Sequence, residues 1–140
     1  MSWKKLSSKE VFRNSLFSMR VDKCLTTQKK EMPAYFVVDF PDWVQILALD
    51  EQKQVILVKQ YRYPTDKSFI ELPGGTTEPK KEESNLDAAK RELLEETGYE
   101  SNDWCLIGSH YPNPAIQTNQ CHVYLAKGCV KVAELNLDPY

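Results

Sequence analysis

The stretch that most constrains this chain runs from Glu71 to Tyr99, where a Gly-Gly pair and a charged loop precede a short acidic segment. Ser84, followed three positions later by Asp87, is a variant of the capping box that begins helices. Apolar residues then recur at helical spacing, and Gly98 lies where a left-handed C-terminal cap is needed. The segment therefore predicts one helix of about three and a half turns between Ser84 and Gly98.

The predicted helix carries its acidic residues together. At roughly 100° per residue, Glu92, Glu95 and Glu96 fall on one face, so a positive charge is expected beside them. The commoner interpretation of such a helix is a solvated acidic face. Carboxylates are also the ligands that Mg²⁺ prefers, and Gly74 and Gly75, without a Cβ, let backbone groups approach an ion closely. We therefore expect a divalent cation and phosphate chemistry here.

These residues resemble the box motif of the Nudix hydrolases. That motif reads Gly, five residues, Glu, seven residues, then Arg-Glu-apolar-any-Glu-Glu-any-Gly-apolar. From Glu83 onward the match is complete, with seven residues between Glu83 and Arg91. Upstream, seven residues rather than five separate Gly75 from Glu83, which indicates a two-residue insertion in the loop 76–82. The box is therefore assigned to residues 74–99.

The resemblance implies a role for each residue of the box. Glu92 and Glu95 would be catalytic, with Glu92 the first choice of general base because a carboxylate beside the cation needs only a short proton transfer. Arg91 and Gly98 would be structural, and Arg91 would hold the carboxylates in register. The implied cation is Mg²⁺ or Mn²⁺, and the residues that would hold it are Glu83, Glu92, Glu95, Glu96 and the backbone of Gly74 or Gly75.

The whole chain is expected to adopt the fold that the resemblance implies. This is an α/β fold, an α/β/α sandwich with a mixed β-sheet and a catalytic loop-helix-loop, preceded by an N-terminal β-hairpin region. With 140 residues, 41% of them hydrophobic, the chain is long enough for one domain and too short for two of ordinary size. Residues 1–140 are thus expected to form a single domain, with residues 1–42 as the N-terminal strand region. Strands are predicted at 16–25, 34–40, 43–49, 54–62, 68–72, 103–110 and 121–127.

The segment before the box indicates the substrate. A Gln-Tyr-Arg run ending at Arg62, followed by Glu-Leu-Pro-Gly-Gly from Glu71, resembles the ADP-ribose pyrophosphatase branch of the family. Arg62 is a candidate phosphate contact because its planar fork suits a diphosphate. Trp43 is a candidate for stacking a nucleobase, and Glu71 for lying at the site. A surface charge, core packing and a strand-face charge remain the respective alternatives.

The function implied is divalent-metal-dependent hydrolysis of the pyrophosphate bond of a nucleoside diphosphate sugar. ADP-ribose or another ADP-sugar would give a nucleoside monophosphate and a sugar phosphate. One alternative substrate is a nucleoside triphosphate, a dinucleoside polyphosphate or capped RNA. An alternative of another class is a nucleotide-sugar-binding module without turnover.

The loop from Tyr111 to Gln120 departs from the family, whose members often present an acidic residue there. No Asp or Glu occurs between residues 104 and 133. The general base is therefore a box glutamate, or the cation alone activates the water. His110 and His122 are alternatives, although a single histidine beside a strand is more often structural.

Composition sets the expected partners. A formal charge of -2 and a pI near 5.7 favour neither nucleic acid nor a membrane surface as a partner. The spacing of Cys24, Cys105, Cys121 and Cys129 indicates neither zinc nor a disulfide scaffold. The N-terminus has no apolar signal core, so a cytoplasmic protein is expected. The resemblance implies a homodimer built through the N-terminal strands. The tail 127–140 is too short for the helix that usually closes the fold, and the chain is either naturally short or truncated.

Overall fold

The structure of this protein, a computed structural model, describes residues 2–78 and 82–134. The chain folds into two compact units. The N-terminal unit holds residues 1–41 and 111–120, and the box unit holds residues 42–110 and 121–140. Because the chain passes between the units three times, at 41–42, 110–111 and 120–121, neither unit is one continuous segment. The single domain over residues 1–140 stays a prediction.

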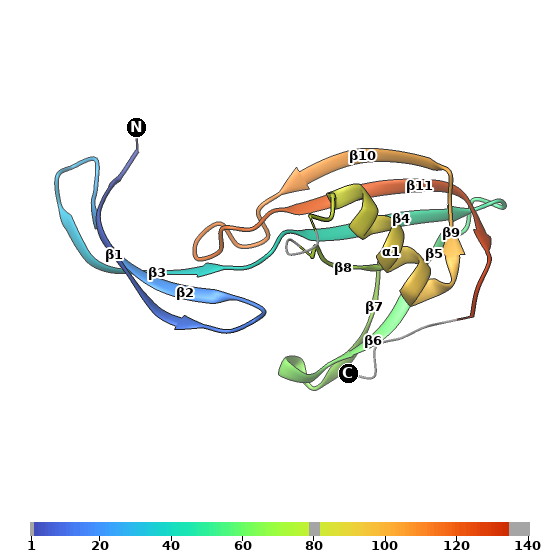
Figure 1. Cartoon of the computed structure of the whole chain (residues 1–140), viewed down its shortest axis with the longest axis horizontal. Helices are drawn as coiled ribbons and strands as arrows, with labels where there is room; N and C mark the ends of the chain where they lie inside the picture. Colours follow the sequence, from blue (N-terminus) through green and yellow to red (C-terminus); the bar gives the residue numbers. More distant parts are fainter. Residues whose placement is uncertain (1, 79–81, 135–140) are drawn as a thin grey trace. The chain divides into compact units, whose positions relative to one another are not determined.

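The elements follow one another along the chain as labelled in Figure 1. They are β1 (Lys4–Arg13), β2 (Ser18–Leu25), β3 (Glu31–Asp39), β4 (Trp43–Asp50), β5 (Val55–Ile56), β6 (Val58–Arg62), a short 3₁₀ turn (Tyr63–Thr65), β7 (Lys67–Glu71), β8 (Gly74–Thr76), α1 (Asn85–Thr97), β9 (Tyr99–Glu100), β10 (Asp103–His110) and β11 (Cys121–Lys131).

The N-terminal unit is built on an antiparallel sheet in the order β1–β2–β3. The hairpin predicted from residues 16–25 and 34–40 is confirmed as β2 and β3. β1 is a further strand that the sequence did not predict. All its residues are exposed, so no alternation of buried and exposed positions marks it.

The loop 111–120 is held by this same sheet. Val38 N–H donates to the Ile116 carbonyl at 2.7 Å, and the Val38 carbonyl accepts from Thr118 N–H at 3.2 Å. The Thr118 hydroxyl also donates to Asp39 at 2.8 Å. The loop is therefore ordered by its contacts with β3.

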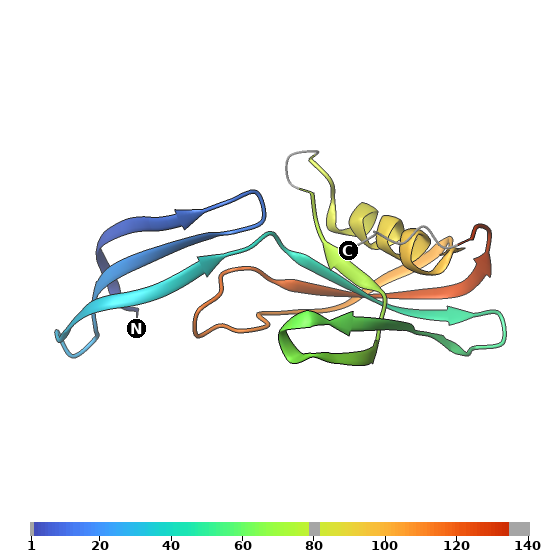
Figure 2. The ribbon, with the colours of Figure 1, turned by 90° about the horizontal axis from the view of Figure 1, so that it is seen from below.

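The box unit contains a mixed sheet in the order β10–β11–β4–β5, with β8 paired to β4 and β9 to β11. β11 and β4 run parallel, and the other pairs are antiparallel. α1 lies on one face of this sheet (Figure 2). The core between helix and strands consists of Val44, Ile46, Ala48, Ala88, Ala89, Leu93, Tyr124, Ala126 and Cys129. The α/β fold with a mixed sheet and a loop-helix-loop is confirmed. Residues 135–140, which the prediction of a short tail concerned, lie outside the described residues.

α1 has the ends that the sequence predicted. The Ser84 hydroxyl accepts from Asp87 N–H at 3.1 Å and donates to the Asp87 carboxylate at 2.6 Å. Gly98 adopts the left-handed conformation with φ 73°, and its N–H donates to the Leu94 carbonyl. A Cβ on Gly98 would lie 2.0 Å from the Ala133 carbonyl oxygen, so glycine is required for space as well as for φ. Across residues 2–78 and 82–134, no helix is long and apolar enough to span a membrane.

The strand predicted at 54–62 is divided in the structure. β5 pairs with β4 in the mixed sheet, whereas β6 pairs with β7 in a separate two-stranded sheet. The pairing partner changes at Leu57, whose side chain is half exposed. This division carries Gln60 and Arg62 away from the mixed sheet on a strand of their own.

Candidate functional site

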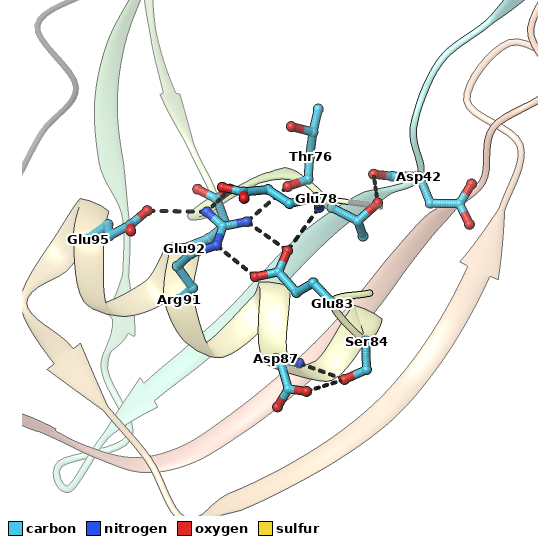
Figure 3. Close-up of polar contacts among 10 residues, drawn as sticks. Asp42, Thr76, Glu78, Glu83, Ser84, Asp87, Arg91, Glu92 and Glu95 are labelled. Carbon is cyan, nitrogen blue, oxygen red and sulfur yellow. Dashed lines mark hydrogen bonds and ion pairs between the residues drawn. The ribbon is translucent and has the colours of Figure 1, made fainter. Parts of the chain in front are cut away.

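Arg91, on α1, is the centre of the site (Figure 3). Its Nε and Nη2 donate to Glu83 at 2.8 and 3.1 Å, which is a bidentate pair. Its Nη1 donates to Glu92 at 2.8 Å and to Glu95 at 3.2 Å. Its Nη2 also donates to the Thr76 carbonyl at 3.0 Å. All five N–H groups of this guanidinium therefore bind acceptors of the chain itself.

The charge of Arg91 offsets the repulsion among the surrounding carboxylates. Its hydrogen bond to Glu83 raises the pKa of Arg91 further above its usual range, although burial opposes this shift. Arg91 is therefore a permanent cation. The sequence indicated that a positive charge should lie beside the acidic face of the helix, and Arg91 supplies one from within the motif.

Glu83 joins the helix to the loop that precedes it. Its side chain is only 13% exposed and accepts from Glu78 N–H at 2.9 Å as well as from Arg91. Residues 79–81, in the loop where the insertion was predicted, lie outside the described residues. The carboxylate of Glu83 thus fixes both Arg91 and the start of that loop.

Glu92 lies directly against Gly75 of β8. A Cβ on Gly75 would lie 2.3 Å from Glu92 Oε1, so a side chain there would displace the carboxylate. Gly74 is equally constrained, because its Cβ would lie 2.2 Å from the Val44 carbonyl oxygen. Burial raises the pKa of Glu92 above its usual value, and the hydrogen bond from Arg91 offsets only part of that shift. The Gly-Gly pair is therefore what lets β8 run between β4 and this carboxylate.

Glu96 has partners of its own. It accepts from Gln60 Nε2 at 2.5 Å and from Gly74 N–H at 2.8 Å. Burial raises the pKa of Glu96, while these two hydrogen bonds and the charge of Arg62 act against the rise. Repulsion from Glu96 also contributes to the raised pKa of Glu92. The two carboxylates are thus electrostatically coupled, although no hydrogen-bond partner is common to both in the described structure.

The predicted substrate contacts lie on neighbouring strands. Arg62 and Glu71 form a bidentate ion pair across β6 and β7, with N–O distances of 3.1 and 2.5 Å. Trp43 is the first residue of β4 and pairs with Thr76 of β8, one residue from Gly75. Their contact with a substrate stays a prediction.

The oxygen donors of the site fit a hard cation in kind. Glu92, Glu95 and Glu96 are carboxylates, and the missing Cβ of Gly75 brings Glu92 against the backbone. In the described part of the chain, no three His, Cys, Asp or Glu side chains converge as a ready metal site. The carboxylates are instead hydrogen-bonded to Arg91, to Gly74 and to Gln60.

Gln60 belongs to the site but was not assigned to it from the sequence. Gln60 binds Glu96, and its position two residues before Arg62 on β6 is the signal that could have found it. His122 was considered as a base, yet it contacts Ser109 at 2.8 Å and Asp42 at 3.3 Å. These contacts join β10, which carries Ser109, β11, which carries His122, and Asp42, the residue before β4.

Known proteins resemble this chain along most of its length. The family model described as NUDIX domain matches residues 40–139. A methanol dehydrogenase activator from Bacillus methanolicus is 32% identical over 132 residues, which are 91% of this chain and 68% of that protein. An ADP-ribose pyrophosphatase from Bacillus subtilis is 33% identical over 129 residues, 89% of this chain and 68% of that protein. A solved structure described as an ADP compounds hydrolase matches with a TM-score of 0.84 and 21% identity, over 100% of this chain and 75% of that one, which shows the fold.

Proposed function

This chain belongs to the Nudix family of hydrolases, which act on pyrophosphate bonds, and we propose that its substrate is a nucleoside diphosphate sugar, ADP-ribose or another ADP-sugar. Water would attack one phosphorus, and the bond from that phosphorus to the bridging oxygen would break. The products would be a nucleoside monophosphate and a sugar phosphate. The observation that carries the proposal is the convergence of Glu83, Glu92 and Glu95 on one arginine.

We propose Mg²⁺ or Mn²⁺ as the cofactor, held by Glu92, Glu95 and Glu96 with the backbone carbonyl of Gly74 or Gly75. When bound, such a cation neutralises phosphate oxygens and acidifies the attacking water. Glu83 is a further proposed ligand of the cation, because its bond with Arg91 places it in the same cluster. The donor chemistry of the box supports the choice of a hard cation.

Glu92 is the proposed general base. Its pKa is raised by burial, which makes its carboxylate a stronger base than an exposed glutamate. Arg91 holds one carboxylate oxygen at 2.8 Å and so orients the group. Glu95, more exposed at 43%, is the second choice because it is held by one longer contact.

Three observations support an ADP-sugar rather than another pyrophosphate. The relative from Bacillus subtilis, named as an ADP-ribose pyrophosphatase, matches 89% of this chain and so includes most of the N-terminal unit. Arg62 and Glu71 lie on β6 and β7, and the charge of Arg62 acts on Glu96. Trp43, the proposed stacking residue for the base, lies at the start of β4, where it pairs with Thr76 next to Gly75.

The test is a panel of substrates with Mg²⁺ and with Mn²⁺. ADP-ribose, other nucleotide-sugars, a nucleoside triphosphate, a dinucleoside polyphosphate and a capped RNA are each incubated with the protein, and the products are identified. The proposal expects AMP and ribose phosphate from ADP-ribose as the fastest reaction. Faster hydrolysis of a triphosphate, a dinucleoside polyphosphate or capped RNA would show that this compound, and not an ADP-sugar, is the substrate. Tight binding without products would favour a binding module.

The proposed roles are tested by Glu92→Gln, Glu95→Gln and Glu96→Gln. Loss of a general base costs about 10²–10⁴-fold in rate, so Glu92→Gln is expected to lower kcat most. Glu100→Gln, at the exposed end of β9, is the matched control and should leave kcat unchanged. Undiminished rates in all three site variants would remove the mechanism.

We also propose that the N-terminal unit joins two copies of the chain. Support comes from large apolar side chains exposed in that unit, among them Leu6, Val11, Phe12, Leu16 and Phe36. Light scattering on the purified protein measures the mass of the particle. A monomer at micromolar concentration would contradict this part of the proposal.

A further inference from the structure

A second set of hydrogen-bonded side chains lies in the box unit, outside the acidic cluster. Ser109 Oγ is 2.8 Å from His122 Nδ1, and His122 Nε2 is 3.3 Å from Asp42 Oδ2. Ser109 and His122 face each other across β10 and β11, and Asp42 immediately precedes β4. His122 is 9% exposed, and each of its ring nitrogens has a partner within the protein.

The chemistry of these groups fixes the direction of the bonds. An ionised carboxylate only accepts, so His122 Nε2 carries a proton and donates to Asp42. In the neutral ring, Nδ1 then accepts from the hydroxyl of Ser109. The imidazole is thus oriented from one side and holds Asp42 from the other.

Asp42 in turn anchors the segment that follows β8. Its backbone carbonyl accepts from Thr77 N–H at 2.9 Å and from the Thr77 hydroxyl at 3.2 Å. Thr77 is only 7% exposed, which indicates that this anchor is part of the fold rather than a surface contact. Figure 3 shows Asp42 on the side of the loop away from Glu95.

The same short segment carries two contacts to the acidic cluster. The carbonyl of Thr76 accepts from Arg91 at 3.0 Å, and Glu78 N–H donates to Glu83 at 2.9 Å. Asp42 therefore holds residues 76–78 at their middle residue. The residues on either side make the contacts to Arg91 and to Glu83. A shift of this segment would move both.

We propose that His122 is a positioning residue for the hydrolysis. By holding the Asp42 carboxylate, it fixes residues 76–78 and, through them, the orientation of Arg91 and Glu83. The inference rests on the proposed function, because it concerns how the groups of that reaction are kept in place.

Two substitutions separate the bonds of the imidazole. His122→Gln places an amide N–H near the position of Nε2 and can keep the bond to Asp42. His122→Asn places its amide near the position of Nδ1, so it can keep Ser109 but not Asp42. Both side chains are neutral amides, so the pair differs mainly in reach. Glu100→Gln, at the exposed end of β9, is the control.

Steady-state kinetics with ADP-ribose and Mg²⁺ is the first measurement. Loss of a residue that orients a metal site costs about 10–100-fold, so we expect kcat of His122→Asn to fall at least about tenfold. His122→Gln should retain most of kcat, and KM should change little in either variant because Arg62 and Trp43 are untouched. Glu100→Gln should behave as the wild type. Equal kcat values in the Asn and Gln variants, whether both high or both low, would overturn the proposal.

Amide hydrogen exchange at Thr77 and Glu78 is the second measurement, and it needs no turnover. Exchange at both amides should be faster in His122→Asn than in His122→Gln, while the two variants melt at similar temperatures. Unchanged exchange in His122→Asn would overturn the anchoring by His122. A wild-type protein that hydrolyses no substrate would remove the proposed function instead, and the exchange pattern would still decide whether His122 holds the segment.

Discussion

At the scale of single residues, Arg91 organises the site. Its five N–H groups serve Glu83, Glu92, Glu95 and the carbonyl of Thr76. A lysine would keep the charge but lose the planar fork that binds several acceptors at fixed angles. The function of this residue therefore depends on its geometry as much as on its charge.

Replacing Arg91 by Lys should lower kcat by about 10–100-fold, because the carboxylates would lose their common support. Arg13→Lys is the matched control. Arg13 also makes a forked pair, with Glu10, but it is exposed on β1, where such pairs contribute little. The measurement is kcat with ADP-ribose for both variants. Full activity of Arg91→Lys would contradict the role assigned to the fork.

Gly75 tests how closely β8 must approach the helix. Gly75→Ala would put a methyl group 2.3 Å from Glu92 Oε1, so the carboxylate must move. We expect a loss of about 100-fold in kcat, of the order that a misplacement of about 1 Å produces, with the fold retained. Gly108→Ala is the control, because a Cβ there meets no atom within 4 Å. Equal kcat values for the two alanine variants would show that the close approach does not matter.

At the scale of elements, α1 connects the core to the site. Ala88, Ala89 and Leu93 bury one side of it, while Arg91 and Glu92 project from another. Its C-terminal end is fixed by Gly98, so the position of the whole helix against the sheet depends on that cap.

The cap can be separated into its two requirements by comparing two glycines. Gly98 and Gly128 both have positive φ, 73° and 59°, but a Cβ would collide with the Ala133 carbonyl only at Gly98. Alanine at Gly128 should cost about 1 kcal/mol for the left-handed backbone alone. Alanine at Gly98 should cost clearly more. Unfolding in urea measures both, and equal losses would show that the collision is relieved without cost.

The elements also show which features a sequence can reveal. The ends of α1 were predictable because Ser84, Asp87 and Gly98 act on residues a few positions away. Gln60 was not assigned, because its partner Glu96 lies 36 residues away along the chain. His122 was named only as an alternative base, because its contact with Asp42, 80 residues away, cannot be seen in the sequence. β1 was missed because its residues are exposed throughout, and pattern alone distinguishes strands only when one face is buried.

At the scale of the whole molecule, the burial of acidic side chains makes the stability of the protein depend on pH. Burial raises the pKa of Glu92 and of Glu96. A carboxyl group whose pKa is higher in the folded state binds protons more tightly there, so its contribution to stability is full below the ordinary value of 4.5 and is lost as the pH rises through the folded pKa.

Without a divalent cation, the melting temperature is therefore expected to fall as the pH rises from about 4.5 through the folded-state pKa values of Glu92 and Glu96. Glu96→Gln should reduce the fall, whereas Glu100→Gln, at the exposed end of β9, should not. Addition of Mg²⁺ should raise the melting temperature most at the high-pH end. The measurement is thermal unfolding against pH, with EDTA and with Mg²⁺. A melting temperature that does not respond to Mg²⁺ at any pH would contradict a cation site at these carboxylates.

The N-terminal unit contributes in a different pH range. Burial alone would raise the pKa of Asp39, but hydrogen bonds from Arg20 and Thr118 and the charge of Arg20 lower it below its usual value. Its contribution is present above the ordinary pKa of 3.8 and is lost as the pH falls through the folded value. The two effects can thus be measured separately in one pH series.

The full set of hydrogen bonds around Arg91 has a consequence for inhibitor design. A compound with a carboxylate or phosphate aimed at that guanidinium would find each donor already engaged, and binding would require it to displace Glu83, Glu92, Glu95 or the carbonyl of Thr76. Such a compound would have to compete with the acceptors of the chain itself for the guanidinium, in addition to any substrate. An anionic ligand for Arg91 must therefore bind more strongly than the acceptors that the chain itself supplies.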